Sequence, residues 1–235
     1  MRRVRVLLAP DSFGGTLTAA EAAEALAAGW RAVRPTDELV LQPLSDGGPG
    51  FLDALPGTRV TALVDDPLGR PTLAALVLDG STAYVEAAQA AGLHLLDPRE
   101  RDPAVATSYG VGELVRTAVE AGATRVVVGL GGTATNDGGA GLLAALGVLT
   151  PELRDLCVVP LREGVAGPAE VAGVELVVAS DVDNPLLGPR GAAAVFGPQK
   201  GASPSEVVQL DQALAMWAKR VGEATGSDLA NRAGA

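Results

Sequence analysis

Three loops of this chain are dense in Asp, Asn, Ser, Thr and Gly, and each follows a short apolar run. They span residues 11–16, 129–139 and 181–185, and the third continues through 188–191 and 197–201. Ligands of α/β proteins bind in loops at the carboxyl ends of parallel strands. The pattern therefore predicts a ligand site to which all three loops contribute.

The loop at residues 129–139 carries the densest set of candidates. They are small or polar residues between flanking glycines, namely Gly131, Gly132, Thr133, Asn136 and Asp137. Glycine lets the backbone approach a ligand and lets N–H groups converge on an anion. A helix is expected to begin at Gly139, so its N-terminus could face a phosphate. A plain turn is the alternative, but it does not need a loop of this length.

The third loop offers charges of both signs. Asp181 and Asp183 lie two residues apart at the end of an apolar run. Carboxylate oxygens are suitable ligands for Mg²⁺. Arg190 and Lys200 could supply the positive charge that a phosphoryl group requires. The competing interpretation is a solvated acidic loop with two surface cations.

A second Asp-Gly-Gly loop, at residues 45–50, follows another apolar run. Asp46, Gly47 and Gly48 are its candidates, alongside Asp11 and Ser12 of the first loop. Asp-Gly pairs are also ordinary turn formers, because an Asp side chain can bond to its own backbone. For Asp46, a turn role explains the sequence as well as a ligand role does.

Composition excludes several classes of function. The net charge is −10 and only two lysines are present, so the basic stripe of a nucleic-acid binder is missing. No run reaches the ~18 apolar residues of a membrane helix, and the apolar run after the N-terminal arginines is too short for a signal peptide. The single Cys157 fits a reducing compartment. We expect a cytoplasmic protein without nucleic-acid or membrane partners.

Familiar nucleotide motifs are absent, with one weak exception. No Gly-Lys pair exists, so there is no Walker A loop. Gly129, Gly131 and Ala134 fit the G-x-G-x-x-A pattern of dinucleotide-binding proteins. However, the polar stretch 135–139 follows where the helix of that motif should already have begun. A nicotinamide-dependent oxidoreductase is therefore a minor alternative.

Hydrophobic patterning predicts an α/β protein that changes style near residue 58. A strand at 4–9, a helix opened by the Thr18/Glu21 capping box and a strand at 39–41 form a β-α-β unit. Short strands separated by turn signals then indicate mixed or antiparallel pairing. The remaining expected elements are strands at 58–65, 72–78, 82–86, 125–130 and 176–179, helices at 112–121 and 139–146, and a last helix capped by Ser203.

Five segments, in order along the chain, resemble the type I glycerate kinases, the family of the bacterial glycerate 2-kinases. They are 9–13, 46–48, 107–113, 131–141 and the run from 181 to 201. The resemblance implies ATP-dependent phosphorylation of D-glycerate with Mg²⁺. It also implies two α/β domains, one flavodoxin-like and one inserted into it with a mixed sheet. We therefore expect residues 1–57 to begin the flavodoxin-like domain, 58–202 to form the inserted domain, and helix 203–235 to return toward the first.

The resemblance also assigns roles to the candidates. Asp181, Asp183 and Lys200 would be catalytic, with both aspartates binding the metal. The residues expected to bind substrate or nucleotide are Asp11, Ser12, Asp46, Gly47, Gly48, Gly131, Gly132, Thr133, Asn136, Asp137, Asn184 and Arg190.

Three departures from the family pattern favour an alternative. Gly14 stands where the family usually has Lys, Pro49 stands where it has Glu, and family members continue well beyond residue 235. A truncated or degenerate non-catalytic relative is therefore the main competing hypothesis. Strands 4–9 and 39–41 would then expose apolar surface, and a homo-oligomer is possible.

Overall fold

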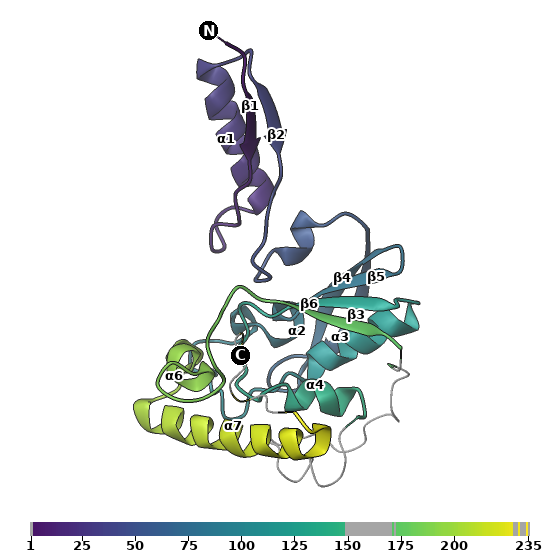
Figure 1. The fold of residues 1–235 in the computed structure, drawn as a ribbon, viewed down its shortest axis with the longest axis vertical. Coiled ribbons are helices and arrows are strands. Elements are labelled where there is room, and N and C mark those ends of the chain that lie inside the picture. Colours follow the sequence, from purple (N-terminus) through teal and green to yellow (C-terminus); the bar gives the residue numbers. More distant parts are fainter. Residues whose placement is uncertain (1, 149–170, 172, 228–229, 231–233, 235) are drawn as a thin grey trace.

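The computed structural model describes residues 2–148, 171, 173–227, 230 and 234, and Cys157 lies outside these residues. Two sheets organise the chain (Figure 1). The smaller sheet pairs β1 (Arg5–Leu8) with β2 (Glu38–Leu41) in parallel, and α1 (Ala19–Val33) connects them. This is the predicted β-α-β unit, and it projects from the rest of the molecule.

Helix α1 begins where its sequence signals predict. The Thr18 hydroxyl accepts a hydrogen bond from the Glu21 N–H, and the Glu21 carboxylate accepts one from the Thr18 N–H, so two end donors are satisfied. One alanine face of the helix is buried, comprising Ala19, Ala22, Ala23 and Ala27. Small side chains let the helix lie close to the two strands.

The larger sheet has the strand order β3-β4-β5-β6-β7. Its strands are β3 (Thr58–Asp65), β4 (Pro71–Asp79), β5 (Thr82–Glu86), β6 (Arg125–Gly129) and β7 (Glu175–Ala179). The first three are antiparallel neighbours, whereas β5, β6 and β7 run parallel. The expectation of a mixed sheet is therefore confirmed, because tight turns join the antiparallel strands and a helix joins β5 to β6.

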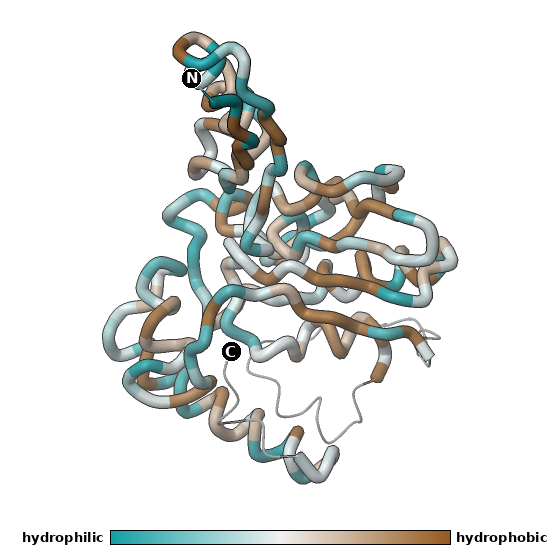
Figure 2. Tube along the Cα trace, turned by 45° about the horizontal axis from the view of Figure 1, so that its top comes forward, coloured by the Kyte–Doolittle hydropathy of each residue, from teal (hydrophilic) through white to brown (hydrophobic). Residues whose placement is uncertain are grey.

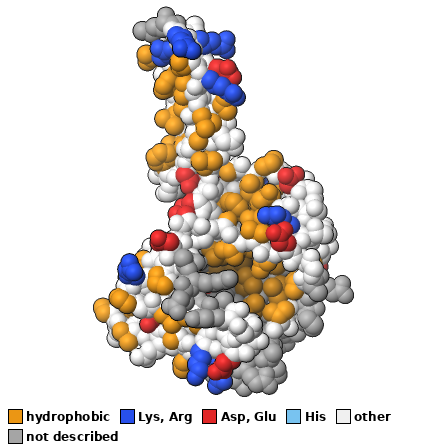
Figure 3. Space-filling model, in the orientation of Figure 1, with side chains coloured by type: hydrophobic (Ala, Val, Ile, Leu, Met, Phe, Trp, Pro, Cys, Tyr) orange, Lys and Arg blue, Asp and Glu red, His pale blue; other side chains and the backbone are white. Residues whose placement is uncertain are grey.

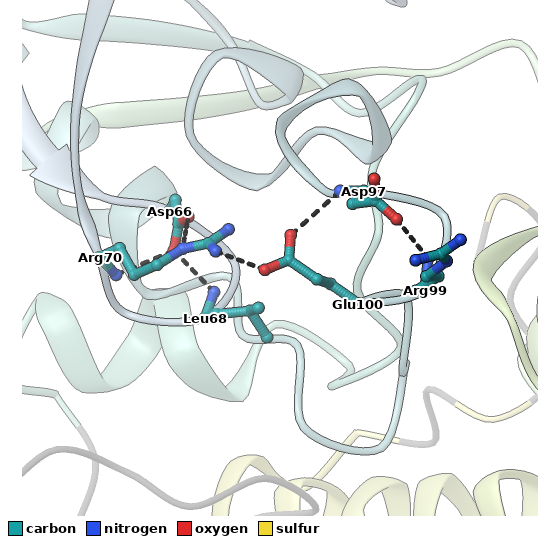
Figure 4. A network of polar contacts seen from close by, with 6 residues as sticks. All are labelled: Asp66, Leu68, Arg70, Asp97, Arg99 and Glu100. Atoms are coloured by element: carbon teal, nitrogen blue, oxygen red, sulfur yellow. Dashed lines mark hydrogen bonds and ion pairs between the residues drawn. The ribbon is translucent and has the colours of Figure 1, made fainter.

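The turn between β3 and β4 is held by an ionic network (Figure 4). The Asp66 carboxylate accepts bonds from the N–H groups of Leu68 and Arg70, both at 2.8 Å, and from Arg70 Nε at 2.6 Å. Arg70 also donates to Glu100 at 2.7 Å, and Glu100 accepts from the Asp97 N–H at 3.0 Å. The network ties the turn to the loop that precedes α3.

Helices cover one face of the large sheet in successive layers. Helix α3 (Tyr109–Glu120) lies on the sheet, and α4 (Ala140–Ala145) packs against α3. Leu76, Val85, Leu114 and Val126 are among the fully buried residues between α3 and the sheet. Figure 2 shows the matching hydrophobic segments along the strands. Short elements complete the region, namely α2 (Ala88–Ala91), η2 (Leu93–Leu95) and, on the other sheet face, η1 (Phe51–Ala54).

The last helix, α7 (Pro204–Thr225), begins at the predicted Ser203/Glu206 capping box. Leu210 and Leu214 pack near Ala193 of α6 (Ala192–Phe196), and Trp217 packs against the alanines of α4. The sequence predicted a helix that returns toward residues 1–57. In the structure its apolar stripe faces the alanine surfaces of α4 and α6, distant from β1 and β2 (Figure 1), and the domain to which this helix belongs stays a prediction.

The small β-α-β unit leaves apolar side chains in contact with solvent. Leu7 is 63% exposed and Val33 is 81% exposed. Hydrophobic side chains accordingly show on the projecting part of the surface in Figure 3. Such surface promotes association, and the homo-oligomer stays a prediction. The domain division also stays a prediction, although the chain does pass from one sheet to the other between β2 and β3.

Among the described residues, no helix is long and apolar enough to cross a membrane.

Candidate active site

A cavity of about 520 Å³ opens at the carboxyl edge of the three parallel strands. Ala87, Leu130 and Ser180 each come directly after one of these strands, and all three line the cavity. Parallel neighbours end at the same sheet edge, so the fold brings together loops that are far apart in sequence. Seven predicted site residues share this lining, namely Gly131, Gly132, Thr133, Asn136, Asp137, Asp181 and Lys200.

Asp137 is buried and its carboxylate is fully engaged. One oxygen accepts bonds from the Ser108 N–H at 2.8 Å, the Ser108 hydroxyl at 2.7 Å and the Gly141 N–H at 3.1 Å. The other accepts from the Gly139 N–H at 3.1 Å. Asp137 therefore joins the start of α3 to the start of α4 and closes the floor of the cavity.

These bonds change the expected role of the α4 N-terminus. The Gly139 and Gly141 N–H groups donate to the Asp137 carboxylate, the Ala140 N–H donates to the Asp137 carbonyl, and the Leu142 N–H donates to the Ser108 hydroxyl. No donor of the first turn is left for an anion. The expectation that this helix end faces a phosphate is not supported, because Asp137 itself supplies the negative charge.

Lys200 is the cation of the cavity. Its Nζ donates to the Thr135 carbonyl at 2.5 Å, which places the ammonium beside the 129–139 loop. Burial lowers the pKa of Lys200 to about 8, and the nearby negative charge of Asp137 only partly opposes this effect. A lysine in this state is cationic at neutral pH and loses its charge in mildly alkaline solution.

With ADP as the probe, we expect any phosphate binding beside Lys200 to weaken as the pH rises through about 8. Lys200 is protonated below this pKa and neutral above it, so a phosphate loses its counter-charge as the pH increases. Calorimetric titration between pH 7 and 9.5 measures the decline. Lys200→Arg stays charged over this range and should bind ADP with little pH dependence. An equal decline in both proteins would assign the titration to another group.

The 45–50 loop touches the 129–139 loop through glycines. The Gly131 N–H donates to the Gly47 carbonyl at 3.1 Å. A Cβ on Gly131 would lie 2.5 Å from the Gly48 Cα, so only glycine permits this contact. Neither Gly47 nor Gly48 lines the cavity itself. The two glycine-rich loops therefore form one continuous surface beside the cavity mouth.

Asp11 and Asp46 hold the neighbouring loops in shape. The Asp11 carboxylate accepts from the Asp46 N–H at 3.2 Å and from the Ser12 N–H at 2.6 Å. The Asp46 carboxylate accepts from the Gly48 N–H at 2.8 Å. Asp46 thus makes the turn that the sequence allowed for it, and Ser12 bonds weakly to Pro49 through its hydroxyl at 3.4 Å. None of these residues lines the cavity.

Glu86 is a buried carboxylate that the sequence analysis did not select. It ends β5, is 2% exposed, and accepts bonds from the N–H groups of Gly50 at 3.1 Å and Leu52 at 3.3 Å. It therefore fixes the 45–50 loop to the sheet edge. A glutamate that directly follows the apolar end of a strand was the available signal. Ser108, which holds Asp137, was missed as well.

Only part of the third loop lines the cavity. Asp181 lines it, whereas Asp183, Asn184 and Arg190 do not. The Asn184 amide donates to the Arg190 carbonyl at 2.9 Å and so closes the loop on itself. Asp181 and Asp183 are both exposed.

The donor set at the cavity fits one mode of Mg²⁺ binding and not another. The described residues contain no group of three or more acidic, His or Cys side chains that could hold a metal ion. Mg²⁺ usually binds through one or two carboxylates together with substrate phosphates and water. The Asp181–Asp183 pair fits that mode and does not fit an all-protein metal cage.

A model of the family described as "Glycerate kinase family" matches residues 6–235. The chain belongs to this family. It is 40% identical over 250 residues to the glycerate kinase of Bacillus subtilis (strain 168) and 39% identical over 253 residues to the glycerate 2-kinase of Escherichia coli (strain K12). A crystal structure from Salmonella typhimurium LT2, described as a glycerate kinase 2, superposes with a TM-score of 0.80 at 37% identity.

Each of these comparisons covers 99% of this chain. In the other direction, the chain spans 65% of the length of each of the two kinases and 66% of the Salmonella protein. The family and the mixed α/β fold predicted from sequence are therefore confirmed, and the activity of the chain remains to be proposed.

Proposed function

We propose that this chain transfers the γ-phosphoryl group of ATP to a hydroxyl of D-glycerate. The observation that carries the proposal is the cavity edge, where Lys200 and Asp181 meet the glycine-rich 129–139 loop in a member of the glycerate kinase family. In-line phosphoryl transfer requires positioning and charge neutralisation more than covalent chemistry from the protein. The cavity residues supply both.

The position of Asp181 and Lys200 on the cavity lining supports the proposed roles. Asp181 and Asp183 would hold Mg²⁺, which neutralises charge on the phosphate oxygens when bound. The Lys200 ammonium, which lines the same cavity as Asp181, would face the same phosphates. As the hydroxyl oxygen of D-glycerate bonds to the γ-phosphorus, the bond from that phosphorus to the β,γ-bridging oxygen breaks, ADP leaves with that oxygen, and the hydroxyl proton is released to solvent.

D-glycerate would lie at the adjoining loops. Asp11, Ser12 and the 46–48 loop are fixed against Gly131, next to the cavity mouth. A small polar acid bound there would present its hydroxyl toward the phosphates. Asn184 and Arg190 stay proposed binding residues on the third loop.

A non-catalytic relative is the second candidate, and the small sheet favours it. Within the described residues this sheet has two strands only, and Leu7 remains 63% exposed. Gly14, which stands where the resembled family usually has Lys, also favours this candidate. Its neighbourhood has room for a side chain, because no atom lies within 4 Å of the position that a Cβ would take. A nicotinamide-dependent oxidoreductase is disfavoured, because α4 begins only at Ala140, beyond the Gly129–Ala134 motif.

Turnover of ATP and D-glycerate decides between the first two candidates. ADP release by the purified chain would be followed in a coupled assay, with ³¹P NMR of the product and L-glycerate as the control substrate. The proposal expects D-glycerate-dependent ADP release and a phosphomonoester signal. Binding of ADP without any turnover would instead identify a non-catalytic relative.

A further inference from the structure

We propose that the cavity is the subsite for the adenine base of the nucleotide, with the phosphates outside at its mouth. This inference rests on the proposed function, because it assumes that the chain binds both a nucleotide and an acid. The volume of the cavity, about 520 Å³, lies within the ~300–1,000 Å³ typical of sites for drug-sized molecules. A three-carbon acid would leave most of that space empty.

The walls of the cavity are largely apolar. Val111 of α3, Leu142 of α4, Phe196 of α6 and Leu214 of α7 all line it, together with Leu186. D-glycerate carries an oxygen on each carbon and would be desolvated at such walls without compensation. A flat heteroaromatic ring matches alkyl and aromatic walls and buries apolar area there.

One polar group inside the cavity awaits a partner. Asn136 lines the cavity and is 6% exposed, and its amide nitrogen is buried with no hydrogen-bond partner among the described residues. A buried donor left unpaired costs about 1–3 kcal/mol. A ring nitrogen of adenine is an acceptor that would satisfy it. Mostly apolar walls with a few placed polar groups are typical of small-molecule sites, and the buried Asn136 amide would fix the orientation of a base there.

The rest of the nucleotide then has a defined direction. Lys200 and Asp181 lie on the cavity lining, and Gly131 contacts the 46–48 loop outside it. A base in the cavity would direct its phosphates past Lys200 and Asp181 toward that loop. With the base in the cavity and the phosphates at its mouth, the γ-phosphate lies next to the proposed acid site. With the acid in the cavity and the nucleotide outside, the acid would instead contact the leucine side chains of the lining.

Ala192→Phe tests the assignment by filling the cavity from the first residue of α6. Ala192 lines the cavity, whereas Val195 on the same helix is 44% exposed and does not line it, so Val195→Phe is the matched control. Calorimetry would measure adenosine, ADP, inorganic tripolyphosphate and D-glycerate binding to the full chain. Ala192→Phe should weaken adenosine and ADP about tenfold or more and leave tripolyphosphate and D-glycerate unchanged. Val195→Phe should change none.

Other outcomes overturn the inference and say which part fails. If Ala192→Phe weakens D-glycerate instead of ADP, the cavity holds the acid, and the proposed function stands. If tripolyphosphate weakens as much as ADP, the cavity holds phosphates. If the unmodified chain binds D-glycerate but no adenine nucleotide, the base pocket and the ATP dependence both fail. If Ala192→Phe does not fold, Val182→Phe takes its place, because Val182 is a half-buried loop residue of the cavity lining. The same changes in adenosine, ADP, tripolyphosphate and D-glycerate binding are then expected.

Discussion

Replacing Asp137 by alanine should lower the free energy of unfolding by about 3 kcal/mol or more, because several buried donors lose their acceptor at once. The side chain is 2% exposed and accepts four hydrogen bonds, three from backbone N–H groups and one from the Ser108 hydroxyl. Its removal leaves those donors buried and unpaired between α3 and α4. Urea denaturation followed by circular dichroism measures the loss.

Asp53→Ala is the matched control for this experiment. Asp53 pairs with Arg59 at the surface, with about half of each side chain exposed. Exposed ion pairs contribute about 0–1 kcal/mol, so the control should change stability little. Ser108→Ala should cost an intermediate amount, because it removes only the hydroxyl bonds to Asp137 and Leu142. A loss below about 1 kcal/mol for Asp137→Ala would contradict the anchoring role.

Asp181→Asn should lower kcat by about 10²–10³ while leaving the unfolding curve unchanged. The carboxylate lines the cavity and is exposed, so its loss removes charge without opening the core. Asp183→Asn should also lower kcat, and both variants should need more Mg²⁺ for half-maximal rate. Initial rates of ADP release over a magnesium series measure these effects.

Asp79→Asn provides the control, because Asp79 is exposed and pairs with the first residue of β5, at the sheet edge opposite the cavity. Its kcat and magnesium dependence should match those of the unmodified chain. If Asp181→Asn retains full turnover at low Mg²⁺, the metal role of this residue is wrong. If only Asp183→Asn is impaired, the metal binds outside the cavity.

Local signals in the sequence were sufficient for most secondary structure. The capping boxes at Thr18 and Ser203 marked the starts of α1 and α7, because a cap depends only on residues within one turn. The turn residues between β3, β4 and β5 likewise predicted the antiparallel part of the sheet. The resemblance of ordered segments predicted the family, which the comparisons confirmed.

The roles of individual loop residues could not be obtained in this way. Asp137 was predicted to be a binding residue of a glycine-rich loop, and no local signal indicated that its carboxylate bonds to Ser108, which lies 29 residues earlier. Glu86 looked like the end of a strand, yet it holds the N–H groups of Gly50 and Leu52. These bonds join segments that are distant in sequence, and no local pattern encodes them.

The sequence alone thus determined the strands and the main helices, the mixed α/β class and the loops able to carry chemistry, because each depends mostly on neighbouring residues. The tertiary structure decided that Asp181 and Lys200 share a cavity whereas Asp183 and Arg190 lie outside its lining. It also directed α7 onto α4 and α6. The physical reason is that strand order, parallel pairing and helix packing place residues in space, and these arise from contacts across the whole chain.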